Sequence, residues 1–408
     1  MKALVLAGGL PQIELLKQLR IRGIETVLAD GNSEAIARPY ADTFYQIPIF
    51  DVDVVKNLAQ QEKVDFLITV CADQVLLIVA QVSEMLGLPC YIDYKTAQDV
   101  SDKLKMKAIF KENGIPTSNY VQLEKLTFEK IEELQFPLVV KPVDAYSSKG
   151  VRKAENMEEL QLFYQEAAAI SRSGGVIVEE FCQGDELSVD AFVQDGKVKI
   201  LCISNSDKIK DDGRFVIFRG KYPAVISDTV ANEVAVVAQK IADAFQLKNC
   251  PLLIQMITDG KRVSVLEFCA RTGGNMKYLL IKYVCGVDVI SAAIDLSLNK
   301  LPEINPRDMG NKYVVNDFVY CDKGVFAGIE GFEQQKEIGN LAEYHVLRPV
   351  GMEMRGVHSS SDRIAGFTIL ANSLEEFAEK HEKVVSMTKI LDDQGNDIMR
   401  HDLLPHLF

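Results

Sequence analysis

The residues best suited to chemistry flank a predicted hairpin. Residues 251–272 are PLLIQMITDGKRVSVLEFCART, with an Asp-Gly pair between two apolar runs. Asp-Gly in that setting is the strongest short signal for a β-hairpin. Gln255 and Glu267 lie at nearly equal distances from the turn, so the register predicts that they face each other on paired strands. Amide and carboxylate oxygens placed together suit a hard cation such as Mg²⁺.

A cation and a bendable backbone follow this pair. Arg271 comes four residues after Glu267 and precedes Gly273 and Gly274. Cys269, two residues past Glu267, shares its face of the strand. The functional interpretation is a site for an anion and a metal ion, and the structural alternative is a salt bridge between Glu267 and Arg271.

Further cations occur upstream. Lys103 lies near a helix start, Lys141 at a strand end, and residues 147–150 form a Ser-Ser-Lys-Gly loop. Cations and a polar loop suit phosphate oxygens, and nearby carboxylates could accept hydrogen bonds from an amino group and from ribose hydroxyls. These carboxylates are Glu179, Glu180 and Glu186. Together the residues indicate a nucleoside triphosphate with Mg²⁺, although a lone buried lysine is as often structural.

The elements that must position these residues begin with alternating strands and helices. Strands are predicted over 3–7, 25–30, 64–70 and 88–93, with a helix from about Pro11, which favours a parallel sheet covered by helices. The glycines at 8–9 lack the G-x-G-x-x-G spacing, so a dinucleotide fingerprint is not supported. That turn is either a plain connection or the edge of a substrate site.

After these residues the predicted elements no longer follow the βαβ pattern. A small α+β unit of roughly 75 residues begins with a lysine-rich helix that stops at Asn113-Gly114. Antiparallel strands follow over about 184–300, with hairpin turns at 195–196 and 259–260 and a helix over 228–245. Strands and one helix, over 373–390, are predicted for residues 306–408.

Composition excludes several function classes. The 408 residues suggest two to four subdomains. The net charge of −13 argues against nucleic acid as the main partner. No signal peptide or membrane span is predicted, and the eight scattered cysteines indicate buried free thiols in a reducing cytoplasm. All five histidines lie after residue 344, so a histidine-dependent nucleophile centred on the earlier residues is not expected.

The order and spacing of these motifs resemble the ATP-grasp superfamily across nearly the whole chain. The similarity is closest to carboxylate–amine ligases of the L-amino-acid ligase type, and it extends to carbamoyl phosphate synthetase halves and phosphoribosylglycinamide synthetase. It is carried by SDKLKMKAIFKENGIPT, FPLVVKPVDAYSSKGV, VIVEEFCQGDELSVDAF and LLIQMITDGKRVSVLEFCARTGG, at 101–117, 136–151, 176–192 and 252–274.

The resemblance implies a mixed α/β and α+β ATP-grasp fold. A parallel βαβ (pre-ATP-grasp) domain would span 1–96, and a helical and lid subdomain would span 97–183. A catalytic subdomain built on an antiparallel sheet would span 184–305. An α+β segment over 306–408 would pack on the catalytic subdomain.

The resemblance also implies roles for single residues. Arg271 and Lys141 would be catalytic, with Arg271 stabilising the transferring phosphoryl group and the backbone N–H groups of Gly273 and Gly274 nearby. Gln255 and Glu267 would hold Mg²⁺ or Mn²⁺. The remaining residues would bind ATP. Lys103 and Lys141 would bind its phosphates, and Ser147, Ser148, Lys149 and Gly150 would form a mobile loop over them. Glu179 and the backbone around Phe181 and Cys182 would bind the adenine, with Glu180 beside them, and Glu186 would bind the ribose.

One position departs from the family pattern. The common E-x-N-P-R motif has an asparagine as a third metal ligand, and this chain has Cys269 there. A protonated thiol is a poor ligand for a hard ion. Weaker or differently arranged binding of a second metal ion is therefore expected.

The implied reaction begins with a carboxylate that attacks ATP, giving an acyl phosphate and ADP, and an amine then forms an amide. The alternatives are a bicarbonate-using carboxylase or carbamoyl phosphate synthetase-like enzyme, and a non-catalytic ATP-binding protein. The partners would be a small carboxylate and a small amine, with no nucleic acid and no membrane, and a homodimer is left open. Candidate substrate contacts are Arg214, Arg219, Lys221, Tyr222, Asn275 and Lys277, with a solvated hairpin end as the structural alternative for the first four.

Overall fold

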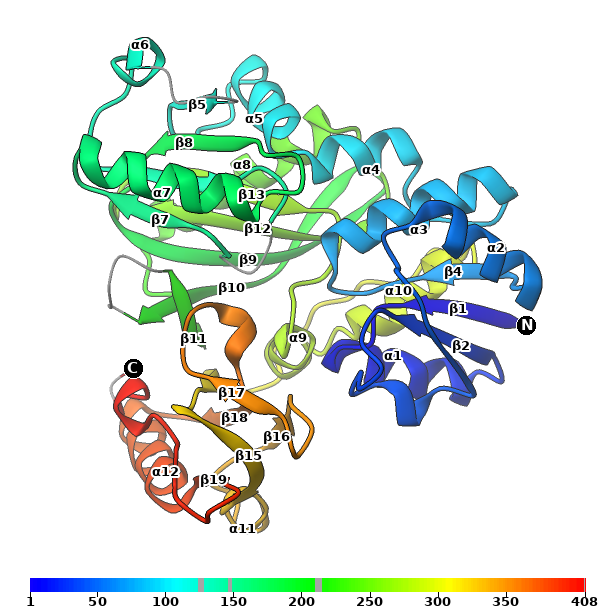
Figure 1. Ribbon diagram of the computed structural model, residues 1–408, viewed down its shortest axis with the longest axis vertical. Helices are drawn as coiled ribbons and strands as arrows, with labels where there is room; N and C mark the ends of the chain where they lie inside the picture. Colours follow the sequence, from blue (N-terminus) through cyan, green and yellow to red (C-terminus); the bar gives the residue numbers. More distant parts are fainter. Residues whose placement is uncertain (124–127, 146–148, 210–214, 407) are drawn as a thin grey trace.

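The computed structural model describes residues 1–123, 128–145, 149–209, 215–406 and 408, and within these ranges the strands form four sheets (Figure 1). The first sheet is parallel, in the order β3-β2-β1-β4. Its strands are β1 (Lys2–Leu6), β2 (Glu25–Asp30), β3 (Thr43–Gln46) and β4 (Phe66–Ile68), and its helices are α1 (Leu10–Ile21), α2 (Val52–Glu62) and α3 (Asp73–Leu86). The predicted βαβ pattern is confirmed.

The strand predicted over 88–93 is wrong. These residues form an irregular connection to α4 (Tyr94–Ser101), and the fourth strand of the sheet is β3. Pro89 has no backbone N–H to donate to a ladder. The Tyr91 hydroxyl donates to the carbonyl of Ala270 at 3.2 Å, so the connection is tied to a distant part of the chain.

A second, antiparallel sheet in the order β5-β8-β6-β7 carries the predicted lid unit. Helix α7 packs against it over a small core of its own. The elements of this part are α5 (Lys103–Glu112), β5 (Tyr120–Leu123), α6 (Phe128–Ile131), β6 (Leu138–Pro142), β7 (Arg152–Ala154), α7 (Met157–Ile170) and β8 (Val176–Glu180). We call these four strands the lid sheet.

The central sheet has eight strands in the order β13-β12-β9-β10-β11-β14-β18-β16. Its first five strands are β9 (Asp185–Gln194), β10 (Lys197–Ile209), β11 (Val216–Tyr222), β12 (Cys250–Thr258) and β13 (Val263–Cys269). Both predicted hairpins are confirmed by the pairing of β9 with β10 and of β12 with β13. At the first turn Asp195 and Gly196 have φ of 50° and 76°, the left-handed pair that a two-residue hairpin turn needs.

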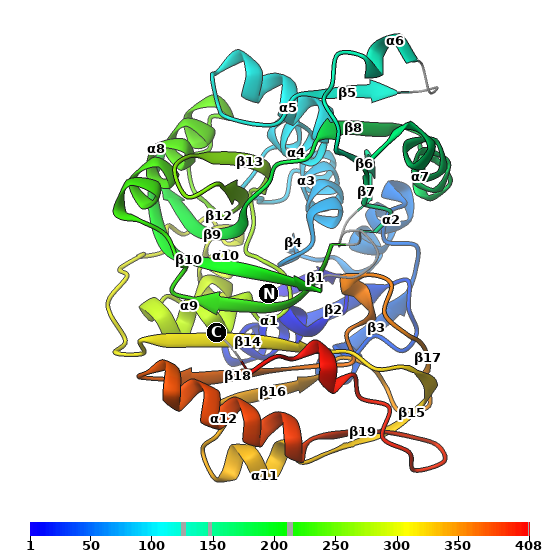
Figure 2. The ribbon, with the colours of Figure 1, turned by 90° about the vertical axis from the view of Figure 1, so that its left-hand side faces the viewer.

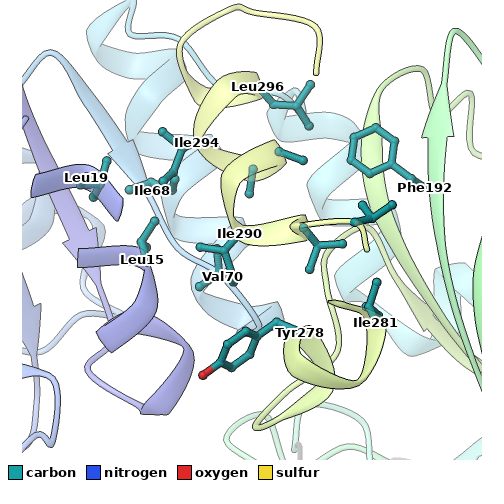
Figure 3. Packing of buried hydrophobic residues seen from close by; sticks show 14 of the residues in the cluster. Leu15, Leu19, Ile68, Val70, Phe192, Tyr278, Ile281, Ile290, Ile294 and Leu296 are labelled. Atoms are coloured by element: carbon teal, nitrogen blue, oxygen red, sulfur yellow. The ribbon is translucent and has the colours of Figure 1, made fainter. Parts of the chain in front are cut away.

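The central sheet and the first sheet share a core. One face of the central sheet is covered by α8 (Asp228–Ala244), and α10 (Val289–Ser297) lies between the other face and α1. Figure 3 shows Leu15 and Leu19 of α1 on one side of α10, whose Ile290 and Ile294 are labelled, and Phe192 of β9 on the other. Helix α9 (Lys277–Cys285) belongs to the same cluster. The core therefore fixes the first sheet relative to the strands that carry Gln255 and Glu267.

Residues 306–408 continue the central sheet, whereas the sequence predicted only that they would pack on it (Figure 2). β14 (Tyr313–Val319) pairs with β11, and β18 (Ala365–Ala371) and β16 (Glu343–Val346) follow. This pairing satisfies backbone groups that β11 would otherwise expose as an edge. The other elements are β15 (Lys323–Glu330), α11 (Phe332–Glu337), β17 (Glu353–Arg355), α12 (Leu374–Met387), β19 (Lys389–Asp392), and the 3₁₀ helices η1 (Arg38–Tyr40), η2 (Ser360–Asp362) and η3 (His401–Leu403).

Candidate active site

A pocket of about 1270 Å³ lies between the lid sheet and the central sheet. It is lined by residues of β6, β7, β8, β9, β10, β12 and β13, by the start of α5 and by residues 400–405. Ten residues predicted from sequence line it: Lys103, Lys141, Lys149, Glu179, Glu180, Phe181, Cys182, Glu186, Gln255 and Glu267. Arg271, Gly150, Gly273 and Gly274 are described but are not among its lining residues, and Ser147 and Ser148 lie outside the described residues.

The predicted pairing of Gln255 with Glu267 is confirmed, and a bulge between Gln255 and Met256 shifts the register by one residue to produce it. The Gln255 side-chain amide donates to Glu186 Oε1 at 3.2 Å. Glu267 Oε2 lies 3.5 Å from the ammonium of Lys103, not in a salt bridge with Arg271. Lys103 is the first residue of α5, so its charge adds to the positive end of the helix dipole.

The pair fits a metal ion that arrives with a polyphosphate. Among the described residues, no group of three or more His, Cys, Asp or Glu could hold a metal ion by itself. Mg²⁺ in phosphate sites commonly takes one or two protein carboxylates and completes its shell with phosphate oxygens and water. Glu267 and Gln255 can supply such a partial set, and the Lys103 ammonium beside Glu267 can turn to the same phosphates.

Lys141 belongs to a buried network that sequence reasoning recognised only in part. The Glu179 carboxylate contacts Lys141 through Oε1 and Lys107 through Oε2, the latter at 2.7 Å. Ser118 donates to the same Oε2 at 2.9 Å, and Lys107 also donates to Thr117 and Ser118. Burial opposes ionisation of Glu179, but the two ammonium groups hold its pKa at about 2.

Glu179 is 3% exposed, and Lys107, Lys141 and Ser118 contact its carboxylate. The predicted contact of Glu179 with adenine stays a prediction. Lys107 was missed because the helix that carries it is rich in lysine, and nothing local separates a buried lysine from solvated ones. Its spacing of four residues from Lys103, one helical turn on the same face, was the available signal.

The outer end of β8 offers an aromatic surface. The rings of Phe181 and Phe215 are stacked with centroids 6.2 Å apart, and the ammonium of Lys153 lies 4.5 Å from the Phe181 centroid. Glu180 accepts hydrogen bonds from the Asn119 side chain and from the backbone N–H of Gln135, at 2.9 and 3.0 Å. The flat apolar surface of these rings, just past the end of β8, suits a nucleobase.

Glu186 contacts the ammonium of Lys208 as well as Gln255. Lys208 lies 4.9 Å from the Phe215 ring centroid, so the carboxylate, the cation and the aromatic surface lie next to one another. This places Glu186 between the Gln255–Glu267 pair and the aromatic surface. That is where the sugar of a nucleotide would lie if its base contacts the rings and its phosphates contact Lys103 and Lys141.

Arg271 is held by Asp73, the first residue of α3. Its Nε and Nη2 each donate to one Asp73 oxygen at 2.5 Å, and Nη1 donates to the carbonyl of Thr272 at 2.7 Å. Burial acts to lower the pKa of Arg271, but the Asp73 carboxylate outweighs it, so the pKa is raised. Asp73 was not predicted as a site residue, because it is 198 positions away in sequence.

Cys269 does not have the environment of a metal ligand. Burial raises the pKa of its thiol well above the ordinary value, and a hydrogen bond to Asp73 adds to this. All eight cysteines are free, as the sequence predicts. The thiol therefore stays protonated, in agreement with the expectation that it replaces a ligand without taking over its role.

Gly273 packs closely against the charged side chains of Lys277 and Asp190. A side chain on Gly273 would place its Cβ 2.7 Å from Lys277 Cγ and 3.1 Å from Asp190 Oδ1. Lys277 donates to Ser204 Oγ at 2.6 Å and lies 3.5 Å from Asp190 Oδ2. Position 273 thus needs glycine, because a side chain there would collide with Lys277. The ammonium of Lys277 is engaged by Ser204 and Asp190.

Of the substrate contacts predicted on β11, Arg219 is wrong, whereas Lys221 and Tyr222 stay predictions. Arg219 is fully buried, pairing with Asp317, so it is neither a ligand contact nor a solvated hairpin end. Lys221 pairs with Asp207 at 2.9 Å, and Tyr222 packs against the core shown in Figure 3. Arg214 lies outside the described residues.

A second pocket of about 740 Å³ lies at the turn between β1 and α1. It is lined by backbone of residues 8–10, by the acids Asp30 and Glu34, by Asn275, and by Arg348 and Arg363. Asn275, one of the predicted substrate contacts, has φ of 54° and follows the two glycines, so residues 271–275 connect Arg271 to this pocket. Charges of both signs therefore meet there.

Comparison with known proteins gives these sites a family. Residues 134–278 match the model of the ATP-grasp domain. This stretch, about a third of the chain, is similar to an ATP-grasp domain. The ATP-grasp fold expected from the motifs is confirmed by the solved L-amino acid ligase from Bacillus licheniformis, which superposes with a TM-score of 0.78 at 20% identity over 96% of this chain and 99% of that one.

Two curated relatives match this chain over only part of its length. The carbamoyl-phosphate synthase of Methanobrevibacter smithii is 26% identical over 44% of this chain and 48% of its own length. The phosphoribosylamine–glycine ligase of Lactococcus lactis is 26% identical over 62% of this chain and 61% of its own length. The chain thus spans about half to three fifths of these relatives. No helix in the described ranges is long and apolar enough to cross a bilayer.

Proposed function

We propose that the protein is an ATP-dependent ligase that activates a carboxylate as an acyl phosphate and joins it to an amine, releasing ADP and phosphate. The observation that carries this proposal is the Gln255–Glu267 pair in register, beside Lys103 and Lys141, within the pocket of an ATP-grasp domain. The named relatives and neighbours include ligases that join amines to carboxylates, which supports the same reaction class.

In the proposed nucleotide site, Lys103, Lys141 and Lys149 bind phosphate oxygens. The backbone at Phe181 and Cys182 and the ring of Phe215 bind the adenine, and Glu186 binds the ribose. The network of Lys107 and Glu179 lies behind Lys141 and fixes its ammonium. Gly150, with φ of 72° and its Cα packed near Pro142 and Ile170, turns the chain just after the loop residue Lys149.

Glu267 and Gln255 would hold Mg²⁺, which when bound neutralises phosphate charge. Lys103 and Glu267, which pair at 3.5 Å, can exchange partners without a change in net charge: the ammonium contacts phosphate and the carboxylate contacts the cation. The exchange leaves no charge unpaired in the pocket, which favours binding of the nucleotide and metal together.

Arg271 is proposed to stabilise the transferring phosphoryl group and the adduct of the amine with the acyl group. Asp73 and Thr272 use three of the five N–H donors of its guanidinium, so two can serve the substrate. Asp73 thereby orients the guanidinium group of Arg271. The backbone N–H groups of Gly273 and Gly274 lie next in the chain and are proposed to assist at the same oxygen atoms.

The second pocket is proposed to hold the substrate that carries both charges, such as an amino acid. Asp30 and Glu34 suit an ammonium group, and Arg348 and Arg363 suit a carboxylate. Residues 271–275 connect this pocket with Arg271, so they could carry a substrate group toward the phosphoryl end of the nucleotide.

We also propose the subdomain limits 1–96, 97–183, 184–305 and 306–408, a cytoplasmic location, and Mg²⁺ as the metal. The eight free thiols support a reducing compartment. Light scattering of the purified chain tests whether a homodimer forms.

The decisive test is a screen of carboxylic acids and amines for release of ADP, with hydroxylamine as a trapping nucleophile. An acyl phosphate gives a hydroxamate that depends on ATP, on Mg²⁺ and on the correct acid. Turnover with bicarbonate alone would support the carboxylase or carbamoyl phosphate synthetase-like alternative. Saturable ATP binding with neither ADP nor hydroxamate from any acid would refute the ligase in favour of a non-catalytic nucleotide-binding protein.

A further inference from the structure

Residues 400–405 form a wall of the nucleotide pocket that the sequence motifs do not include. Four of them, Arg400, Asp402, Leu403 and Pro405, line it. They lie near the end of the chain, on the side of β11 away from the lid sheet (Figure 1). The segment forms the single turn η3, and Leu404 points into the core beneath it and is 4% exposed.

The segment is stiffened from within. The Arg400 guanidinium donates through Nε and Nη2 to the two oxygens of Asp402, at 2.8 and 2.7 Å. The backbone N–H of Arg400 donates to the carbonyl of Tyr320, and Met399 bridges to Cys321. The start of the segment is thus fixed to the connection between β14 and β15, whereas Pro405 at its end is held by other residues.

A buried cluster of three charged or titratable side chains supplies that support. Arg219 on β11, Asp317 on β14 and His381 on α12 are each fully buried, and we call them the clamp. Arg219 donates through Nε to Asp317 Oδ1 at 2.6 Å and through Nη2 to Oδ2 at 2.9 Å. The same Nη2 donates to the carbonyl of Pro405 at 2.9 Å.

His381 completes the clamp. Its Nε2 lies 2.9 Å from Asp317 Oδ2 and 2.9 Å from Arg219 Nη2. A carboxylate only accepts and a guanidinium only donates, so a proton on Nε2 gives one good hydrogen bond, to Asp317. This bond fixes the carboxylate against which Arg219 is held, and Arg219 in turn fixes Pro405.

We propose that residues 400–405 contact the bound nucleotide as a preformed wall of its site, and that His381 is a positioning residue for nucleotide binding. His381 acts through Asp317, Arg219 and the Pro405 carbonyl. The inference rests on the proposal that this pocket binds ATP. A wall already in place costs less ordering on binding than a loose one, so loosening the clamp weakens nucleotide affinity.

The first experiment places a reporter in the wall. The chain contains no tryptophan, so Leu403→Trp gives one local fluorophore. Titration with MgADP should change its emission saturably, at the concentration where calorimetry shows binding. The matched control is Leu374→Trp, which lies at the exposed start of α12, is 45% exposed and does not line the pocket, and its emission should stay constant. Unchanged emission from a Leu403→Trp protein that binds MgADP would overturn the inference.

The second experiment loosens the clamp. His381→Phe fills the space but removes the donor to Asp317, whereas His381→Gln keeps an N–H donor. We expect the MgADP Kd and the ATP KM to rise about fivefold to tenfold in the Phe variant, with kcat within twofold, and the Gln variant to recover most of the loss. A folded Phe variant with wild-type Kd would overturn the inference. If the Phe variant does not fold, the titration of the Leu403→Trp protein decides alone.

The two proposals fail in different ways. A wild-type protein that binds neither MgADP nor MgATP refutes the proposed function, and this inference with it. A wild-type protein that binds nucleotide, together with a Leu403→Trp reporter that does not respond to it, refutes this inference only.

Discussion

Lys107→Met is the most informative single change, because it removes a buried cation that the sequence does not distinguish from its neighbours. Lys107 is 1% exposed and lies 2.7 Å from Glu179 Oε2. Methionine keeps most of the volume and removes the charge. We expect two separable effects, a loss of stability and a weaker affinity for nucleotide.

The stability effect follows from Glu179. Its pKa is about 2 against an ordinary 4.5, which at about 1.36 kcal/mol per pKa unit corresponds to at most about 3 kcal/mol, and burial, which lowers the pKa of Lys107, offsets part of this. Lys107 and Lys141 share it, so removing one should cost about 1–2 kcal/mol. For a chain of this size that amounts to a fall of a few degrees in melting temperature.

The affinity effect follows from charge. The network of Lys107, Glu179 and Lys141 carries a net charge of +1, which the variant reduces to zero. At a separation of roughly 10 Å between the network and the nucleotide, and an effective dielectric constant of about 20, the interaction of two unit charges contributes about 1.7 kcal/mol. The Kd for MgADP should therefore rise by about tenfold.

The pH dependence has a definite sign. Glu179 has a depressed pKa in the folded chain, so its contribution to stability is full above about pH 4.5 and is lost as pH falls toward 2. In Lys107→Met the carboxylate has one cation fewer, so its pKa rises and its smaller contribution is lost at higher pH. Thermal melts between pH 3 and 7 measure this shift.

Calorimetry with MgADP and thermal unfolding test the other two effects. The control is Lys105→Met on the same helix, whose side chain is 49% exposed and whose nearest carboxylate, Asp99, is 3.8 Å away. It should leave both the melting temperature and the Kd close to wild type. A Lys107→Met protein with wild-type stability and wild-type Kd would show that the buried network does not act on the pocket.

Three further predictions concern the edge of the central sheet. Glu267→Gln should stay folded and lose at least 90% of its MgATP-dependent ADP release; near-normal turnover would remove Glu267 from the metal site. Arg271→Lys should bind MgADP normally by calorimetry yet form little hydroxamate, because one ammonium cannot satisfy Asp73 and the phosphoryl group together. Cys269, which is partly buried, should react with iodoacetamide at pH 8 far more slowly than in denatured protein, since desolvation raises the pKa of its thiol. Mass spectrometry can follow the labelling, and rapid labelling of the native protein would contradict the raised pKa.

The sequence by itself determined the local features on which the site depends. The Asp-Gly pair indicated the hairpin, because this turn type joins paired strands. The register at the turn pairs Met256 with Val265, and a bulge next to Gln255 then brings Gln255 opposite Glu267. The alternation of predicted strands and helices likewise indicated the parallel sheet at the start of the chain. The resemblance of four segments to the ATP-grasp superfamily, in sequence and in order, implied the fold.

Long-range partners were decided only by the tertiary structure. Asp73 meets Arg271 across 198 positions, and Arg219 meets Asp317 across 98 and Pro405 across 186. A charged residue carries no local mark of burial, since the carboxylate that makes its burial possible comes from another strand or helix. The same reason hid Lys107 among exposed lysines, and it hid the wall at 400–405, whose residues line the pocket only because β14, β16 and β18 extend the central sheet.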